Sequence, residues 1–164
     1  MNNEHRQLAR ALLDSCTAAK LRIATAESCT GGWVAKVMTD LAGSSAVFDR
    51  GFVTYSNEAK MEMLGVNAET LNRQGAVSKQ TVLEMATGAL QQSQAQLSVS
   101  ISGIAGPGGG SIEKPVGTVW FAWAREGTPP TAIHHHFYGN RDVIRHQAVT
   151  TALTGLLDLL PDPS

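Results

Sequence analysis

The sequence has few cysteines, few charged residues and no long apolar run. Cys16 and Cys29 are its two cysteines, too few for a disulfide scaffold or a four-cysteine zinc site. No apolar stretch approaches the roughly 18 residues of a membrane helix. The first ten residues, MNNEHRQLAR, lack the apolar segment of a signal peptide. We therefore expect a cytoplasmic protein with reduced thiols and no membrane partner.

The charges are balanced as well as sparse. Charged residues make up 16% of the chain, against about 25% in average domains. Thirteen Lys and Arg residues oppose 14 Asp and Glu residues, for a net charge of −1. Because nucleic-acid binding depends on clustered positive charge, this balance disfavours DNA or RNA as a partner.

The length of 164 residues and the 43% of apolar residues suit one hydrophobic core. We therefore expect a single domain over residues 1–164. Strand-like and helix-like segments alternate along it, which predicts an α/β protein: a three-layer α/β/α fold with a mixed sheet of about five or six strands. The expected strands lie within 21–28, 47–56, 96–106, 116–124 and 131–139. The expected helices lie within 4–20, 33–43, 57–66, 68–75, 79–95 and 141–159, before a tail at 161–164.

In such folds ligands bind where strands end, and three segments there carry reactive side chains. The first is TAESCTGG, residues 25–32. It places the Ser28 hydroxyl at a strand end and Thr30, Gly31 and Gly32 at a helix start, whose N–H groups can hold a phosphate or an oxyanion. The alternative is an ordinary strand–turn–helix with a Ser/Thr cap.

The second segment is GFVTYSNEAK, residues 51–60. Tyr55 ends a strand, and Lys60 lies one turn into the following helix. The helix dipole and burial both lower the pKa of such a lysine, which favours a neutral amine that can act as a base. The alternative is an exposed lysine on a helix face.

The third segment, SGIAGPGGGSIEKPVGT, spans residues 102–118. Ser102 and Gly103 end the central strand, and the glycines after them allow a close approach of the backbone to a ligand. No Walker A or dinucleotide fingerprint is present, so alone the segment is equally compatible with a flexible turn. Together, the three segments indicate an acyl-transfer site in which a lysine replaces histidine as the base.

Cys29, beside Ser28, is an alternative nucleophile because a thiol is intrinsically well suited, although no histidine is clearly placed to pair with it. Arg141, at the start of the last helix, could clamp a phosphate or carboxylate or lie on a solvated face. The histidines His134–His136 suggest a metal, but on a strand only His134 and His136 share a face. No Cys or carboxylate at ligand spacing supports them, so we expect no metal.

Several motifs occur in order along residues 5–158. The motifs are TAESCTGG, GSSAVFDRGFVTYSNEAK, LGV, GAVS, SGIAGPGGG and KPVGTVWF. In this order and spacing the chain closely resembles the CinA C-terminal domain family.

The resemblance implies hydrolysis of nicotinamide mononucleotide to nicotinate mononucleotide and ammonia. It implies a three-layer fold, a homodimer or higher homo-oligomer, and a serine mechanism with no metal or cofactor. Ser28 would be the nucleophile, Lys60 its general base, and Tyr55 an aid to proton transfer or positioning. Ser102, where many relatives have Thr, would bind substrate with Arg141. The strand-end residue Gly103 and the turn residues Thr30, Gly31 and Gly32 are further candidates for substrate binding.

Two other functions stay open at this point. One is a nucleotide-binding module without catalysis, which the presence of Ser28, Tyr55 and Lys60 disfavours. The other is an accessory protein of competence or DNA repair, which the neutral charge balance disfavours.

Overall fold

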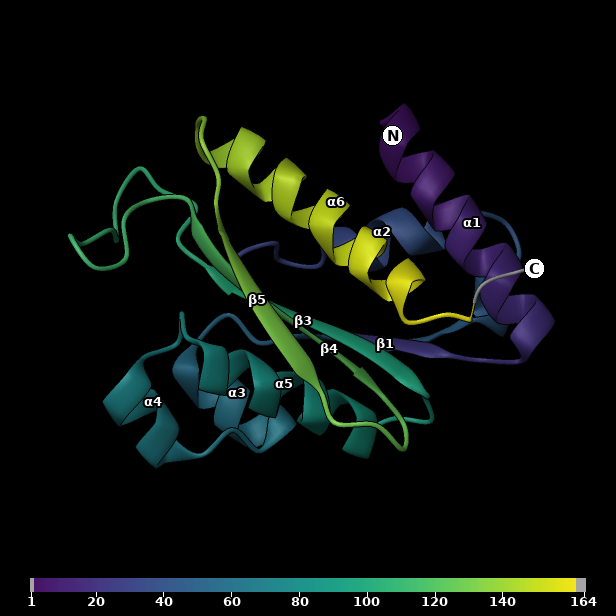
Figure 1. The fold of residues 1–164 in the computed structure, drawn as a ribbon, viewed down its shortest axis with the longest axis horizontal. Coiled ribbons are helices and arrows are strands. Elements are labelled where there is room, and N and C mark those ends of the chain that lie inside the picture. The colour runs from purple at the N-terminus through teal and green to yellow at the C-terminus, as the bar shows by residue number, and fades with distance from the viewer. Residues whose placement is uncertain (1, 162–164) are drawn as a thin grey trace.

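The computed structural model describes residues 2–161, so residues 162–164 of the expected tail lie outside the described residues. Within that range a sheet of five strands lies between two helical layers (Figure 1). This confirms the predicted three-layer α/β/α fold. The strands are β1 (Ile23–Glu27), β2 (Phe48–Val53), β3 (Leu97–Gly103), β4 (Thr118–Arg125) and β5 (Thr131–His136).

Helices cover both faces of the sheet, with α1, α2 and α6 on one face and α3, α4 and α5 on the other (Figure 1). Their bounds are α1 (Asn3–Ala19), α2 (Trp33–Thr39), α3 (Asn57–Leu64), α4 (Ala68–Gln74), α5 (Lys79–Gln91) and α6 (Arg141–Asp158), with a short 3₁₀ helix η1 (Ser44–Ala46). None of the helices between residues 2 and 161 combines the length and hydropathy that a bilayer crossing requires.

The sheet is mixed, in the order β2-β1-β3-β4-β5. Strands β2, β1 and β3 are parallel, whereas β4 and β5 run antiparallel to their neighbours. The carboxyl ends of the three parallel strands therefore meet at one edge of the sheet. This topology brings the three reactive segments of the sequence together.

The central strand β3 alternates between two kinds of side chain. Val99 and Ile101 face the layer of α1, α2 and α6 in a fully apolar core. On the opposite face, the Ser98 hydroxyl donates to the Ala86 carbonyl at 2.8 Å and the Ser100 hydroxyl donates to the Val82 carbonyl at 2.6 Å. Because serine is small and finds an acceptor here, α5 packs directly against the sheet.

Local signals place the helix that carries Lys60. The sequence allows Ser56 or Asn57 as the cap of α3 and Gly65 as its end. In the structure Ser56 is the cap, its side chain accepting from the Ala59 N–H at 3.0 Å, and Gly65 ends the helix with φ +70°. Ser78 likewise caps α5.

Two helices end earlier than the sequence predicts. Helix α2 ends at Thr39, whose hydroxyl donates to the Ala35 carbonyl at 2.8 Å and competes with the continuing helix. Helix α5 ends at Gln91 rather than near residue 95, because the Gln94 N–H donates to Asp49 at 2.9 Å as the chain turns toward β3.

We expect Gly88→Ala to lower the free energy of unfolding by about 1–3 kcal/mol, the usual cost of overpacking. A Cβ atom at Gly88, where α5 crosses α3, would lie 2.0 Å from the Leu64 carbonyl oxygen, and backbone cannot rotate away. Urea denaturation measures the loss. Thr87→Ala on the same helix is the control, and equal stability of the two variants would contradict the close packing.

Candidate active site

Ser28 and Lys60 form a buried pair at the carboxyl edge of the sheet. Ser28 follows β1, and its N–H continues the ladder by donating to the Ile101 carbonyl of β3 at 2.9 Å. Lys60 lies in the first turn of α3, and a hydrogen bond of 3.1 Å joins its Nζ atom to Ser28 Oγ. The exposed fractions are 8% for Ser28 and 1% for Lys60. A hydroxyl and an amine therefore meet away from bulk water.

Lys60 lies among neutral groups. Its Nζ atom donates to the Thr54 carbonyl at 2.9 Å and to the Tyr55 carbonyl at 3.4 Å. No carboxylate between residues 2 and 161 pairs with it. Burial lowers the pKa of Lys60, because the charged amine is poorly solvated there. This direction agrees with the shift that the sequence predicts and favours an amine that can accept a proton.

Cys29 lies beside the nucleophile candidate and lines the same cavity. The residue is only 6% exposed, and its side chain belongs to the apolar core. Burial raises the pKa of Cys29 to about 12, so the thiol stays protonated near neutral pH. Since the thiolate is the reactive form, this environment favours Ser28 over Cys29 as nucleophile.

A cavity of about 260 Å³ opens over the pair, close to the lower end of small-molecule sites, about 300–1,000 Å³. Six residues that the sequence predicts for the site line it, together with the alternative nucleophile Cys29: Ser28, Tyr55, Lys60, Ser102, Gly103 and Arg141. The glycine-rich loop after β3 supplies another part of the wall, through residues 104–106, 108 and 109.

Tyr55 and Arg141 form the rim of this cavity. The tyrosine side chain is 60% exposed, and its hydroxyl accepts a hydrogen bond from Arg141 Nη2 at 3.0 Å. Arg141 Nη1 also donates to the Gly106 carbonyl at 2.7 Å. The arginine thus joins the start of α6 to both the β2 exit and the glycine-rich loop. The backbone carbonyl of Tyr55 accepts from Lys60, whereas the phenol of Tyr55 contacts Arg141.

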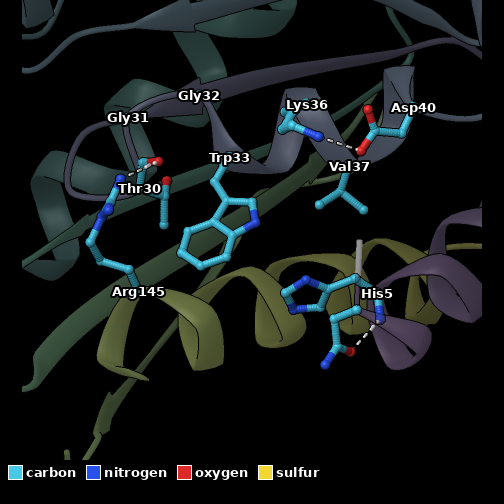
Figure 2. Close-up of a pocket in the computed structure, with 10 residues that line it drawn as sticks. His5, Thr30, Gly31, Gly32, Trp33, Lys36, Val37, Asp40 and Arg145 are labelled. Carbon is cyan, nitrogen blue, oxygen red and sulfur yellow. Dashed lines mark hydrogen bonds and ion pairs between the residues drawn. The ribbon is translucent and has the colours of Figure 1, made fainter. Parts of the chain in front are cut away.

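Thr30, Gly31 and Gly32 do not line the Ser28 cavity. They border a second cavity of about 510 Å³, together with Trp33 and Arg145 (Figure 2). The Gly31 N–H donates to the Ser28 carbonyl at 3.0 Å, so it is already paired within the turn. The structure separates these three residues from the Ser28–Lys60 pair.

The backbone N–H groups at the start of α2 already have hydrogen-bond acceptors within the protein. The Glu27 side chain accepts from the N–H groups of Val34 at 3.0 Å and Ala35 at 3.1 Å, and from the Thr30 hydroxyl at 2.6 Å. Because these donors are taken, the anion site that the sequence suggests at this helix start is filled by an internal side chain.

Three wall residues and the two side chains that anchor the turn were not predicted from the sequence. Asn57, Ala76 and Val77 line the Ser28 cavity, and the GAVS segment that contains the last two is one of the shared motifs. Glu27 anchors the turn from one side and Arg145 from the other. The spacing of Arg145 from Arg141 places both on one helix face, but it does not indicate what each contacts.

The histidines of β5 have aromatic and backbone neighbours. The His134 ring lies 4.6 Å from the Trp120 ring between centroids, and His136 Nε2 lies 3.0 Å from the Val116 carbonyl oxygen. Within residues 2–161, no three His, Cys, Asp or Glu side chains are grouped so that they could hold a metal ion.

The burial of Lys60 predicts a pH-dependent stability. The folded protein holds its pKa below the unfolded value, so between the two values the unfolded chain binds more protons and stability rises with pH. We expect the free energy of unfolding of the wild type to rise relative to Lys60→Met between pH ~7 and ~10. Urea titrations of both proteins across that range measure the difference. A difference independent of pH would contradict a lowered pKa.

Comparisons with known proteins agree with this fold. The family model of the CinA C-terminal domain matches residues 5–160 of the sequence. The nicotinamide-nucleotide amidohydrolase PncC of Escherichia coli K12 is 56% identical over 155 residues, which cover 94% of each chain. The PncC of Pseudomonas putida is 48% identical and covers 84% of this chain and 86% of its own.

A solved structure extends the likeness to three dimensions. The competence/damage-inducible protein CihA of Agrobacterium tumefaciens superimposes with a TM-score of 0.92 at 49% identity, covering 97% of both chains. Family model, relatives and structure thus agree over nearly the full length. The chain belongs to the CinA C-terminal domain family.

Proposed function

We propose that this protein hydrolyses the amide of nicotinamide mononucleotide, giving nicotinate mononucleotide and ammonia. Relatives at 56% and 48% identity are nicotinamide-nucleotide amidohydrolases. The single observation that carries the chemistry is the buried contact of 3.1 Å between Ser28 Oγ and Lys60 Nζ. A hydroxyl beside an amine with a lowered pKa is a nucleophile with its base.

Lys60 acts in its neutral form. Its two N–H groups then donate to the carbonyls of Thr54 and Tyr55, which leaves its lone pair directed at the Ser28 hydroxyl. The amine accepts the hydroxyl proton as Ser28 Oγ attacks the carboxamide carbon. The resulting lysine ammonium then protonates the departing nitrogen, and ammonia leaves an acyl-enzyme on Ser28.

Water completes the cycle. Lys60, neutral again after ammonia departs, removes a proton from the attacking water, and the acyl–oxygen bond breaks to release the acid and restore Ser28. The net reaction consumes one water and one amide and yields one carboxylic acid and one ammonia. Tyr55, with its hydroxyl at the cavity mouth, assists proton transfer or positions the substrate.

A backbone N–H group of the turn holds the oxyanion. The N–H groups of Ser28 and Gly31 are paired with carbonyls. Within residues 2–161, the N–H groups of Cys29, Thr30 and Gly32 have no backbone acceptor. Of these three residues only Cys29 lines the Ser28 cavity, so its N–H is the donor we assign. This assignment replaces the wider Thr30–Gly32 set that the sequence suggests.

Arg141 is the cation we assign to the substrate phosphate, since a guanidinium binds phosphate with paired donors. Ser102 and Gly103 support the carboxamide end at the floor of the cavity. We further propose that residues 1–164 act as one domain in the cytoplasm, as a homodimer or higher homo-oligomer, as the family resemblance implies.

Ammonia release from nicotinamide mononucleotide tests the reaction and its nucleophile. In the presence of chelator, we expect release by the wild type and by Cys29→Ala. We expect a loss of several orders of magnitude in Ser28→Ala, because the attacking oxygen is gone. A coupled ammonia assay measures all three.

Other outcomes would redirect the assignment. Loss in Cys29→Ala alone would move the nucleophile by one residue. Binding of the nucleotide without release by the wild type would favour the noncatalytic binding module.

Lys60→Arg tests the base. Guanidinium stays protonated in proteins, so the variant keeps the positive charge but loses the proton acceptor. We expect a fall in kcat of about 10²–10⁴-fold, the usual contribution of general base catalysis. Steady-state kinetics measure it, with Lys36→Arg on the surface of α2 as the control. Near-normal turnover by Lys60→Arg would reject the base assignment.

A further inference from the structure

The turn that carries Ser28 is held from two sides. On the inner side, Glu27 binds the Thr30 hydroxyl and the start of α2. On the outer side lies Arg145 of α6, more than a hundred residues away in sequence. Arg145 Nε donates to the Cys29 carbonyl at 2.9 Å and Arg145 Nη2 to the Thr30 carbonyl at 3.2 Å. Figure 2 shows the arginine beside Thr30 at the border of the second cavity, with the hydrogen bond between them drawn as a dashed line.

These bonds fix the peptide planes after the nucleophile. A peptide unit is planar and trans, so its C=O and the following N–H point in opposite directions. The bond from Arg145 to the Cys29 carbonyl therefore sets the direction of the Thr30 N–H. The Gly31 N–H, by binding the Ser28 carbonyl at 3.0 Å, sets that of the Cys29 N–H. The Cys29 N–H assigned to the oxyanion thus lies in a turn whose next two carbonyls, those of Cys29 and Thr30, are held by Arg145.

The guanidinium of Arg145 is itself held in place. Its Cζ atom lies 5.5 Å from the centroid of the Trp33 ring, a distance at which a cation is attracted by an aromatic face. Trp33 in turn meets the His146 ring edge-on at 5.9 Å between centroids. The planar guanidinium offers donors to two carbonyls at once, which a lysine ammonium cannot do with the same geometry.

The two arginines of α6 have different surroundings. Arg141 lines the Ser28 cavity, whereas Arg145, one turn later, lines the other cavity and contacts the back of the turn. Resting on the proposed amidohydrolase function, we propose that Arg145 is a positioning residue for that reaction. Without touching substrate, it holds the turn so that Ser28 Oγ stays at Lys60 Nζ and the Cys29 N–H stays aimed at the oxyanion.

Arg145→Met tests this role in the full-length protein. Misplacement of a reacting group by about 1 Å can cost about 10²-fold, so we expect kcat to fall by about that factor while KM stays within about threefold. We expect Arg145→Lys to lose less, because it keeps one donor. Arg125→Met is the matched control, since Arg125 Nη1 also donates to a carbonyl, that of Leu159 at 2.7 Å, but far from the turn.

A second readout does not use the nucleotide. A fluorophosphonate probe reacts when Ser28 Oγ displaces fluoride, and intact mass measures the rate of labelling. We expect Arg145→Met to label more slowly than Arg125→Met. Labelling of the wild type without ammonia release would reject the proposed function. The labelling rates of the variants would still test whether Arg145 positions Ser28. A wild type that shows neither labelling nor release would overturn both.

Chemical rescue separates positioning from a general loss of stability. The second cavity gives a small cation access to the space that Arg145→Ala leaves. We expect millimolar guanidinium to restore part of the kcat of Arg145→Ala and to leave Arg125→Ala unchanged, with thermal midpoints recorded for both. If Arg145→Met fails to fold, Arg145→Lys carries the comparison. A kcat of the folded Arg145 variants within threefold of the Arg125 controls, or a change in KM alone, would overturn the proposal.

Discussion

The site depends on one constraint: the burial of an amine without a carboxylate partner. Lys60 is 1% exposed and meets a hydroxyl and two backbone carbonyls rather than a carboxylate. A carboxylate partner would stabilise the ammonium and raise the pKa, so the neutral surroundings preserve basicity. The protein therefore gives up some stability near neutral pH in order to keep a proton acceptor beside Ser28.

The sheet topology supplies the geometry for this pair. Ser28 leaves β1, the strand next to β2, and the chain leaving β2 enters α3 after the Ser56 cap, so the two side chains arrive from neighbouring strands. Helix α6 completes the arrangement from across the sheet edge. Its first turn carries Arg141 to the cavity and its second carries Arg145 to the turn. Lys60 lies on α3 and Ser28 directly follows β1, whereas the loop after β3 forms part of the wall.

Much of this arrangement was predictable from local sequence. The caps Ser56 and Ser78 and the stop at Gly65 are encoded within a few residues, and strand ends in an α/β pattern mark the site edge. The surroundings of Thr30–Gly32 were not predictable. The direction of the N–H groups in the turn depends on Glu27 and on Arg145. Arg145 contacts the turn from more than a hundred residues away in sequence. Helix ends at Thr39 and Gln91 depended on side-chain hydrogen bonds that compete with the helix.

The position of β2 at the edge of the sheet has a consequence for how activity is lost. Strand β1 is buried along its whole length, whereas β2 is exposed or half-buried throughout. Edge elements with little buried area open at lower free energy than the global fold. Opening of β2 and α3 would withdraw the base while the nucleophile stays on an intact core. On warming, such local opening would inactivate the protein reversibly before the whole fold melts cooperatively.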